Sequence, residues 1–248
     1  MTMNLQGKVV IVTGGARGIG SAASKSLAQR GAKVVVNYLK NQDAAEAVVS
    51  DIRSSGGEAI ALRADVRDSD QFAKLVDAVL DAFGKIDILV CNANMSFTAK
   101  PFAEMNWEEF SQKLNDELKA AFVTTKSVIP SMIKQKFGRI IYVSSSLGKD
   151  PSPYMIAHGT AKGGVNTFSD YIAQEFGPQG ISANVVAPGL VQTDATAFLS
   201  EEEKQTISSF TPLRRVAEPD DIAGVISFLA SDDSRFITGS YTPVTGGL

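Results

Sequence analysis

The segment Thr13-Gly14-Gly15-Ala16-Arg17-Gly18-Ile19-Gly20 decides the fold of this chain. It follows an apolar run at residues 9–12 and precedes a segment with small and apolar residues at helical spacing. This order predicts a strand, a glycine turn and a helix. Glycines let the backbone approach a pyrophosphate closely, and the start of a helix supplies free N–H groups and the positive end of its dipole. The segment therefore predicts a binding site for a nucleotide cofactor.

The composition indicates one globular domain over residues 1–248, and we expect no signal or transit peptide. Hydrophobic residues make up 44% of the chain, yet no apolar run approaches the roughly 20 residues needed to cross a bilayer. The net charge of −3 argues against a nucleic-acid-binding surface. A single cysteine, Cys91, and a single histidine argue against a disulfide and a metal-ligand cluster. We expect a cytoplasmic protein with no metal, no membrane contact and no nucleic-acid partner.

Apolar β-branched runs alternate with helical patterns along the whole chain. Strands are predicted over 8–13, 33–38, 58–63, 86–91, 138–144, 181–187 and 239–244, and helices over 18–30, 41–55, 69–83, 105–134, 156–176 and 219–230. Such alternation is typical of an α/β fold in which a doubly wound parallel sheet carries helices on both faces. Asp43, and either Asp68 or Ser69, are the expected N-caps of the second and third helices. The longest stretch without a clear pattern, residues 188–212, is the expected lid over the substrate.

Further motifs follow the glycine turn in a fixed order. They are Ala64-Asp65-Val66, Cys91-Asn92-Ala93-Asn94, a strand ending at Ser144-Ser145-Ser146, then Lys162, Pro188-Gly189 with Thr193, and Thr238-Gly239. Together they resemble the short-chain dehydrogenase/reductase family over essentially the whole chain, and within it the 3-oxoacyl-acyl-carrier-protein reductases. The resemblance implies a single-domain Rossmann fold with seven strands. It also implies a homotetramer or homodimer, built partly on the two long helices after the fourth and fifth strands.

The end of the second predicted strand indicates which dinucleotide is bound. Sites that prefer NAD place an Asp or Glu there, where it accepts a hydrogen bond from the ribose 2′-hydroxyl. Residues 36–40 read Val-Asn-Tyr-Leu-Lys, with no carboxylate before Asp43. Arg17 and Lys40 could pair with a 2′-phosphate, although Lys40 could equally be a solvated surface charge. We therefore predict NADP(H) as the cofactor.

The resemblance implies the remaining cofactor contacts. They include Gly14, Gly18, Ile19 and Gly20 in the glycine turn and Tyr38 at the end of the second predicted strand. Asp65 and Val66 are expected near the adenine, and Asn92 and Ala93 along the ribose. The remaining contacts are Lys162, Pro188, Gly189, Val191 and Thr193, with Thr193 at the nicotinamide end. Asp65 has a simpler interpretation as a turn-forming residue after the third strand.

The predicted reaction centre departs from the family at two positions. In the family, a serine orients the substrate carbonyl, a tyrosine donates the proton, and a lysine four residues later holds the nicotinamide ribose. Ser145 and Lys162 match the serine and the lysine, but His158 stands at the tyrosine position. Glu117 stands where the family has an asparagine that holds a proton-relay water. The resemblance therefore predicts an oxidoreductase with an altered proton donor.

Two residues compete for the role of that donor. His158 and Lys162 share one helix face at i, i+4, and a nearby cation should push the imidazole pKa below about 6.5 while Glu117 pushes it upward. His158 then either transfers the proton, directly or through a water, or only orients the substrate. Tyr154, eight residues before Lys162, is the alternative donor, and its simpler interpretation is an ordinary aromatic in a substrate loop.

The expected substrate side is apolar. Its candidate residues are Met95, Phe97, Phe102, Phe198 and Leu199, which suit an acyl chain or a fused ring, although apolar lid residues usually only pack. The leading hypothesis is an NADPH-dependent reductase of a carbonyl, with a β-ketoacyl thioester or a polyketide-like intermediate as substrate, free or on a carrier protein. One alternative is an enoyl-thioester reductase that uses Tyr154. The other is a redox-inactive scaffold, or a cyclase or dehydratase with His158 and Glu117 as base and acid.

Overall fold

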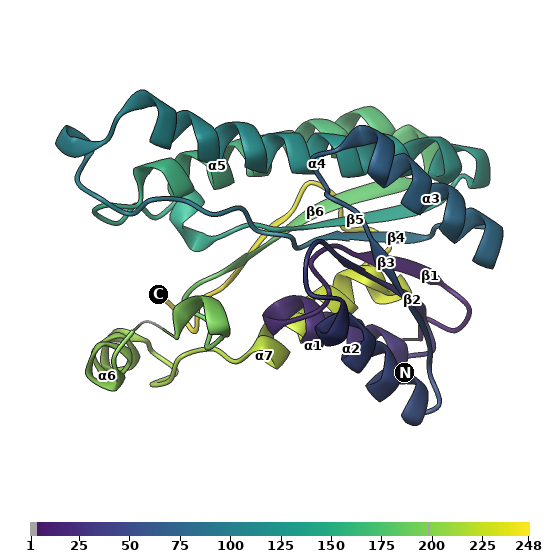
Figure 1. The fold of residues 1–248 in the computed structure, drawn as a ribbon, viewed down its shortest axis with the longest axis horizontal. Helices are drawn as coiled ribbons and strands as arrows, with labels where there is room; N and C mark the ends of the chain where they lie inside the picture. The colour runs from purple at the N-terminus through teal and green to yellow at the C-terminus, as the bar shows by residue number, and fades with distance from the viewer. Residues whose placement is uncertain (1–3, 198) are drawn as a thin grey trace.

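A seven-stranded parallel sheet forms the centre of the computed structural model, which describes residues 4–197 and 199–248. Its strands are β1 (Val9–Val12), β2 (Lys33–Tyr38), β3 (Glu58–Arg63), β4 (Ile88–Cys91), β5 (Gly138–Val143), β6 (Ile181–Pro188) and β7 (Tyr241–Val244), in the order β3-β2-β1-β4-β5-β6-β7 (Figure 1). Successive β1 residues feed opposite cores: Val10 packs into one and Ile11 into the other. Both faces of the sheet are thus buried, which explains why the strands are apolar at successive positions and do not alternate with polar residues.

Helices cover both faces of this sheet (Figure 1). One layer holds α1 (Gly18–Gln29), α2 (Gln42–Ser54) and α7 (Pro219–Ala230), and the other holds α3 (Ser69–Phe83), α4 (Trp107–Gln135) and α5 (Ile156–Phe176). This arrangement confirms the predicted doubly wound Rossmann fold. Within the part of the chain that the structure describes, no helix combines the length and the apolar composition needed to span a membrane.

The predicted elements differ from the observed ones mainly at their ends. Asp68 caps α3 as expected, because its side chain accepts from the backbone N–H groups at the start of that helix. The expectation for α2 was wrong: Asn41 caps it, accepting from the N–H of Ala44 at 3.0 Å, and Asp43 lies inside the first turn.

The stretch 188–212 contains a helix that the sequence patterns did not reveal. This helix, α6 (Glu201–Phe210), begins with a capping box in which Ser200 and Glu203 exchange side-chain and backbone hydrogen bonds. None of its described residues is buried, and its sequence has only two large apolar residues, Ile207 and Phe210, which are too few for an apolar stripe. The capping box was the signal available in the sequence.

The strand order reverses between β1 and β4, and the carboxyl ends of the central strands meet at this point. In open α/β sheets, ligands bind in the crevice outside these ends, at the topological switch point. The fold therefore directs the search for a site to the loops that follow β1, β4, β5 and β6.

Candidate active site

The glycine turn after β1 leads into a helix start without a side-chain cap. Arg17 is the N-cap residue of α1, its side chain makes no capping hydrogen bond, and the first turn contains no acidic residue. The first N–H groups of the helix are thus left for another acceptor, and the positive end of the helix dipole has no carboxylate near it. This helix start is suited to bind an anion such as a phosphate.

Close packing around the turn explains two of its glycines. Gly14 has φ +60°, and a Cβ placed on it would lie 3.1 Å from the Cα of Ala93. A Cβ on Gly20 would meet the carbonyl oxygen of Gly14 and would lie 2.6 Å from Asn92 Nδ2. The turn therefore touches the loop after β4 with backbone against backbone.

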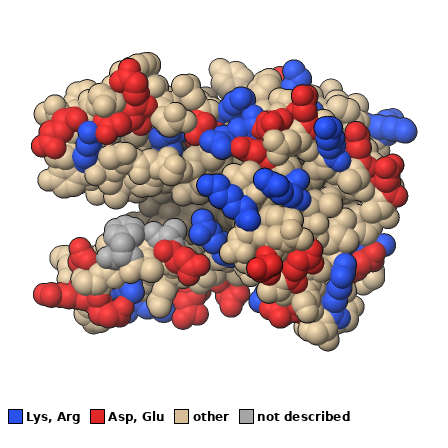
Figure 2. Space-filling model, in the orientation of Figure 1, with Lys and Arg blue, Asp and Glu red and all other residues tan. Residues whose placement is uncertain are grey.

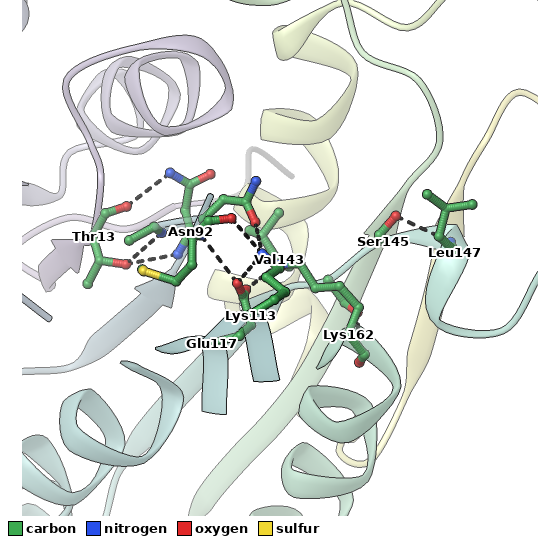
Figure 3. A network of polar contacts seen from close by, with 12 residues as sticks. Thr13, Asn92, Lys113, Glu117, Val143, Ser145, Leu147 and Lys162 are labelled. Atoms are coloured by element: carbon green, nitrogen blue, oxygen red, sulfur yellow. Dashed lines mark hydrogen bonds and ion pairs between the residues drawn. The ribbon is translucent and has the colours of Figure 1, made fainter. Parts of the chain in front are cut away.

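Asn92 and Thr13 lock these two loops together (Figure 3). Asn92 Nδ2 donates to the carbonyl oxygens of Thr13 at 2.9 Å and Gly14 at 3.1 Å. Thr13 Oγ1 accepts from the backbone N–H groups of Asn92 at 2.9 Å and Ala93 at 3.1 Å. Both amide hydrogens of Asn92 are used inside the protein, so its side chain shapes the floor of the crevice.

Basic side chains follow three adjacent strands at the edge of the crevice. Arg17 lies after β1 and Lys40 lies after β2, both exposed, while Tyr38 ends β2 and is buried. Arg63, which the sequence analysis missed, ends β3 in register with Tyr38, and its Nε donates to the carbonyl oxygen of Leu39 at 3.1 Å. Three positive charges thus stand where these strands end.

The loop after β3 is fixed by an internal ion pair. Asp65 accepts from the backbone N–H of Arg67 at 2.9 Å and from its guanidinium at 3.0 and 2.8 Å. Arg67 also pairs with Asp116 on α4, at 2.9 Å. The Arg67 side-chain hydrogen bond is the main cause of a lowered pKa of Asp65. The carboxylate of Asp65 therefore acts first as a turn residue, and Val66 beside it is buried.

The loop after β6 returns to the glycine turn. Pro188 ends β6, and the N–H of Gly189 donates to the carbonyl oxygen of Val244 at 3.1 Å. Val191 is buried and forms an isolated bridge with Ala217. A Cβ on Gly18 would lie 3.3 Å from Cγ2 of Thr193, which brings this loop against the start of α1.

The three serines after β5 have different surroundings. Ser144 is buried, and its hydroxyl donates to Asn166 Oδ1 at 2.6 Å. Ser145 is partly exposed, and its Oγ accepts from the N–H of Leu147 at 3.2 Å (Figure 3). Its hydroxyl hydrogen has no acceptor among the described residues, so Ser145 can donate to a ligand.

Lys162, Glu117 and Lys113 form a buried chain of charges at the centre of the site (Figure 3). The carboxylate of Glu117 is 5% exposed, with Oε1 2.6 Å from Lys162 Nζ and Oε2 2.6 Å from Lys113 Nζ. Burial raises the pKa of Glu117, but Lys162 and Lys113 together outweigh it and lower this pKa to about 2. Glu117 is therefore ionised at neutral pH, which opposes a role as an acid in a dehydratase or cyclase.

His158 lies one helical turn before Lys162 on α5 and is 8% exposed. Phe97 stacks on its ring, with the two centroids 4.6 Å apart and the planes inclined by 28°. Nδ1 is buried without a hydrogen-bond partner among the described residues. Burial, and then the charges of Lys162 and Lys113, lower the pKa of His158 to about 3. The imidazole is therefore neutral at pH 7, and burial, which the i, i+4 spacing does not reveal, is the largest cause.

Tyr154 lies apart from this group. It precedes α5 with φ +69°, and its side chain is 59% exposed. No hydrogen bond of its hydroxyl occurs among the described residues. The phenol of Tyr154 is thus the less favourably placed of the two predicted donors.

The predicted apolar substrate residues have different exposures. Met95 and Leu199 are partly buried and Phe102 is 71% exposed, while Phe198 lies outside the described residues.

Figure 2 shows a hollow between the layer of α4 and α5 and the segment that carries α6, with basic side chains at its inner end. The sequence patterns missed Lys113, which is fully buried on α4 beside Glu117. Its spacing to Glu117, four residues along one helix, was visible in the sequence, but such pairs usually lie on surfaces.

Known proteins resemble this chain over nearly its whole length. A family model described as "Enoyl-(Acyl carrier protein) reductase" matches residues 14–248. A 3-oxoacyl-[acyl-carrier-protein] reductase of Synechocystis sp. is 40% identical over 245 residues, which cover 98% of this chain and 98% of the relative. A 3-oxoacyl-[acyl-carrier-protein] reductase of Staphylococcus epidermidis is 36% identical over 97% of this chain and 98% of its own. The crystal structure of a dehydrogenase/reductase from Sinorhizobium meliloti has a TM-score of 0.91 at 32% identity, covering 99% of this chain and 96% of that chain.

Proposed function

The chain belongs to the short-chain dehydrogenase/reductase family, and from this premise we propose that it is an NADPH-dependent reductase of a carbonyl group. One observation carries the proposal: a single sheet edge holds an uncapped helix start after β1 and the side chains of Ser145, His158 and Lys162 after β5. The relatives named as 3-oxoacyl-[acyl-carrier-protein] reductases support a β-ketoacyl thioester, or a related polyketide-like intermediate, as the substrate. A carrier protein is the proposed partner that presents it.

The residues at this edge fit a nicotinamide dinucleotide. The uncapped N–H groups at the start of α1 would hold the pyrophosphate, in a turn whose close packing against the loop after β4 leaves no room for a Cβ at Gly14 or Gly20. Lys162 would hold the nicotinamide ribose, and Thr193 would lie near the nicotinamide. When bound, NADPH supplies the hydride that reduces the carbonyl carbon.

The charges at the ends of β1, β2 and β3 support a preference for the phosphorylated cofactor. Arg17, Lys40 and Arg63 would surround a 2′-phosphate, and guanidinium groups form strong paired hydrogen bonds with phosphates. The loop after β2 offers no carboxylate before Asp43 that could accept from a 2′-hydroxyl.

The proton step follows from the neutral state of His158. The hydroxyl of Ser145 and an N–H of the imidazole would donate to the carbonyl oxygen, and a neutral imidazole can polarise a carbonyl in this way. As the carbonyl is reduced, negative charge develops on the oxygen, which then takes the proton from the imidazole nitrogen. The ammonium groups of Lys162 and Lys113 stabilise the negative ring that remains, until solvent returns a proton to it.

The proposed activity is tested by following NADPH absorbance over a panel of β-ketoacyl thioesters and cyclic ketones. We expect turnover with at least one ketoacyl thioester, and a loss of about 100-fold or more in His158→Ala. Tyr154→Phe is the matched control, and we expect it to retain turnover because its side chain points to solvent. A protein that binds NADPH but reduces no member of the panel would refute the proposed reaction, and the reverse pattern of the two variants would favour enoyl reduction by Tyr154.

We further propose that the protein assembles as a homotetramer or homodimer through α4 and α5. The two helices pack side by side, and they carry exposed aromatic side chains: Phe122 is 50% exposed and Tyr171 is 72% exposed. Large apolar groups of this kind are typical of buried interface cores. Light scattering of Tyr171→Glu against the unaltered protein measures whether this face carries the assembly.

A further inference from the structure

Lys113 is a fully buried lysine in the wall of the site, one helical turn before Glu117 on α4. Its Nζ donates to Glu117 Oε2 at 2.6 Å, to the carbonyl oxygen of Met95 at 2.7 Å and to Asn94 Oδ1 at 2.9 Å. An ammonium carries three hydrogens, and each has an acceptor here. Lys113 therefore has no donor left for a ligand, and its position is fixed from three sides.

The carboxylate of Glu117 is divided between two tasks (Figure 3). Oε2 accepts from Lys113 and from the N–H of Met95, the latter at 3.3 Å. Oε1 accepts from Lys162 at 2.6 Å. As long as Lys113 occupies Oε2, Glu117 offers only one oxygen to Lys162.

Lys162 keeps one hydrogen free as a result. Its Nζ donates to Glu117 Oε1 and to the carbonyl oxygen of Val143, at 3.0 Å. The third N–H has no acceptor within residues 4–197 and 199–248. This is the hydrogen that can reach an oxygen of a bound molecule.

We propose that Lys113 is a positioning residue, which restrains Glu117 so that the ammonium of Lys162 keeps one N–H for the cofactor ribose. This inference rests on the proposed function, because it is the dinucleotide that would use this N–H. Without Lys113, only the N–H of Met95 holds Oε2, at 3.3 Å, so Glu117 can turn both oxygens toward Lys162 and occupy its last donor. The network also has a net charge of +1, from two lysines and one glutamate, which favours an anionic ligand.

The charges that face Lys113 come from two helices. Glu117 and Asp116 lie on its own helix, and Lys162 and His158 lie on α5. Burial lowers the pKa of Lys113 to about 8, against the opposing effect of Glu117. The restraint on Glu117 should therefore weaken as the pH rises above this value.

Three variants separate positioning from a merely structural role. Lys113→Met should raise the Kd for NADPH by about tenfold or more, because Lys162 loses its free donor. Lys113→Met combined with Glu117→Gln should restore the Kd to within about threefold of the unaltered protein, since the amide oxygen accepts only from Lys162 and the net charge returns to +1. Lys113→Arg should bind NADPH with an affinity that no longer falls above pH 8, because guanidinium stays protonated.

Calorimetry gives the Kd values, and crystal structures of the ligand-free variants give a second readout that needs no cofactor. In Lys113→Met, we expect Lys162 Nζ to contact both carboxylate oxygens of Glu117, and in the double variant to contact the single amide oxygen. A double variant that binds as weakly as Lys113→Met, or a Lys113→Met structure in which Oε2 stays away from Lys162, would overturn the inference. If the unaltered protein takes up neither NADPH nor NADH, the proposed function fails, and the crystal structures still decide the role of Lys113.

Discussion

Replacing Glu117 by glutamine removes the negative charge between two buried ammonium groups. The pKa of Glu117 falls from 4.5 to about 2 in the folded protein, and each unit corresponds to about 1.36 kcal/mol, so the carboxylate contributes about 3 kcal/mol at neutral pH. Breaking a buried ion pair by removing one partner costs about 3–5 kcal/mol, which agrees with this value. We therefore expect Glu117→Gln to lower the free energy of unfolding at pH 7 by about 3 kcal/mol.

The sign of the pH dependence follows from the lowered pKa. A group whose folded pKa lies below its unfolded pKa stabilises the protein above the unfolded value, and this contribution is lost as the pH falls through the folded value. About 2 kcal/mol of the 3 should be lost by pH 3, so the difference between the unaltered protein and Glu117→Gln should shrink to about 1 kcal/mol there. Urea unfolding at pH 7 and pH 3 measures both differences.

Glu58→Gln is the matched control for this experiment. Glu58 pairs with Lys33 at 3.0 Å, but its side chain is 54% exposed, and exposed pairs contribute about 1 kcal/mol or less. A loss below about 1 kcal/mol for Glu117→Gln at pH 7, no larger than that of the control, would refute the description of Glu117 as the buried counter-charge of two lysines.

Three further variants, two of them with a matched control variant, test other parts of the site. Ser145→Ala should lower kcat by about 100-fold in steady-state kinetics, since it removes a donor to the developing oxyanion. Its control, Ser144→Ala, should leave kcat nearly unchanged and should lower the free energy of unfolding in urea by about 1 kcal/mol. In calorimetry, Arg17→Ala should raise the Kd for NADPH by about tenfold and change the Kd for NADH little. Its control is Lys25→Ala, because Lys25 lies on the helix that Arg17 caps and is already ion-paired; this variant should change neither Kd. Gly20→Ala should lower the free energy of unfolding by about 1–3 kcal/mol, because its Cβ would meet backbone at the turn, and an unchanged unfolding midpoint would contradict this.

The extent to which the sequence predicted each helix depends on how its ends are marked. The range 69–83 agrees with α3 because Asp68 caps its start and Gly84 adopts the left-handed conformation at its end. The range 219–230 agrees with α7, which has a proline at its first position. α6 was missed because it is short and none of its described residues is buried, so only its capping box distinguished it from a loop.

Whether a residue of the site could be predicted also depends on what marks its position in the sequence. The order of Ser145, His158 and Lys162 could be read from motifs, because each lies at a fixed place relative to a strand or helix. Lys113 could not be found in this way. A lysine four residues before a glutamate looks like a surface pair, and only the tertiary packing reveals that Lys113 is fully buried.

The field of Lys162 acts differently on a histidine than it would on a tyrosine. An adjacent ammonium stabilises phenolate, so it makes a tyrosine a better acid at neutral pH. The same charge destabilises imidazolium, and at His158 it combines with burial to keep the ring neutral. In the proposed reaction, His158 would therefore deliver its proton from the N–H of the neutral ring and not as an imidazolium. The second ammonium, Lys113, would assist this step, because both cations would stabilise the ring after that proton has left. The charges of Lys162 and Lys113 that disfavour the imidazolium would thus also stabilise the negative ring that remains when the neutral imidazole gives up its proton.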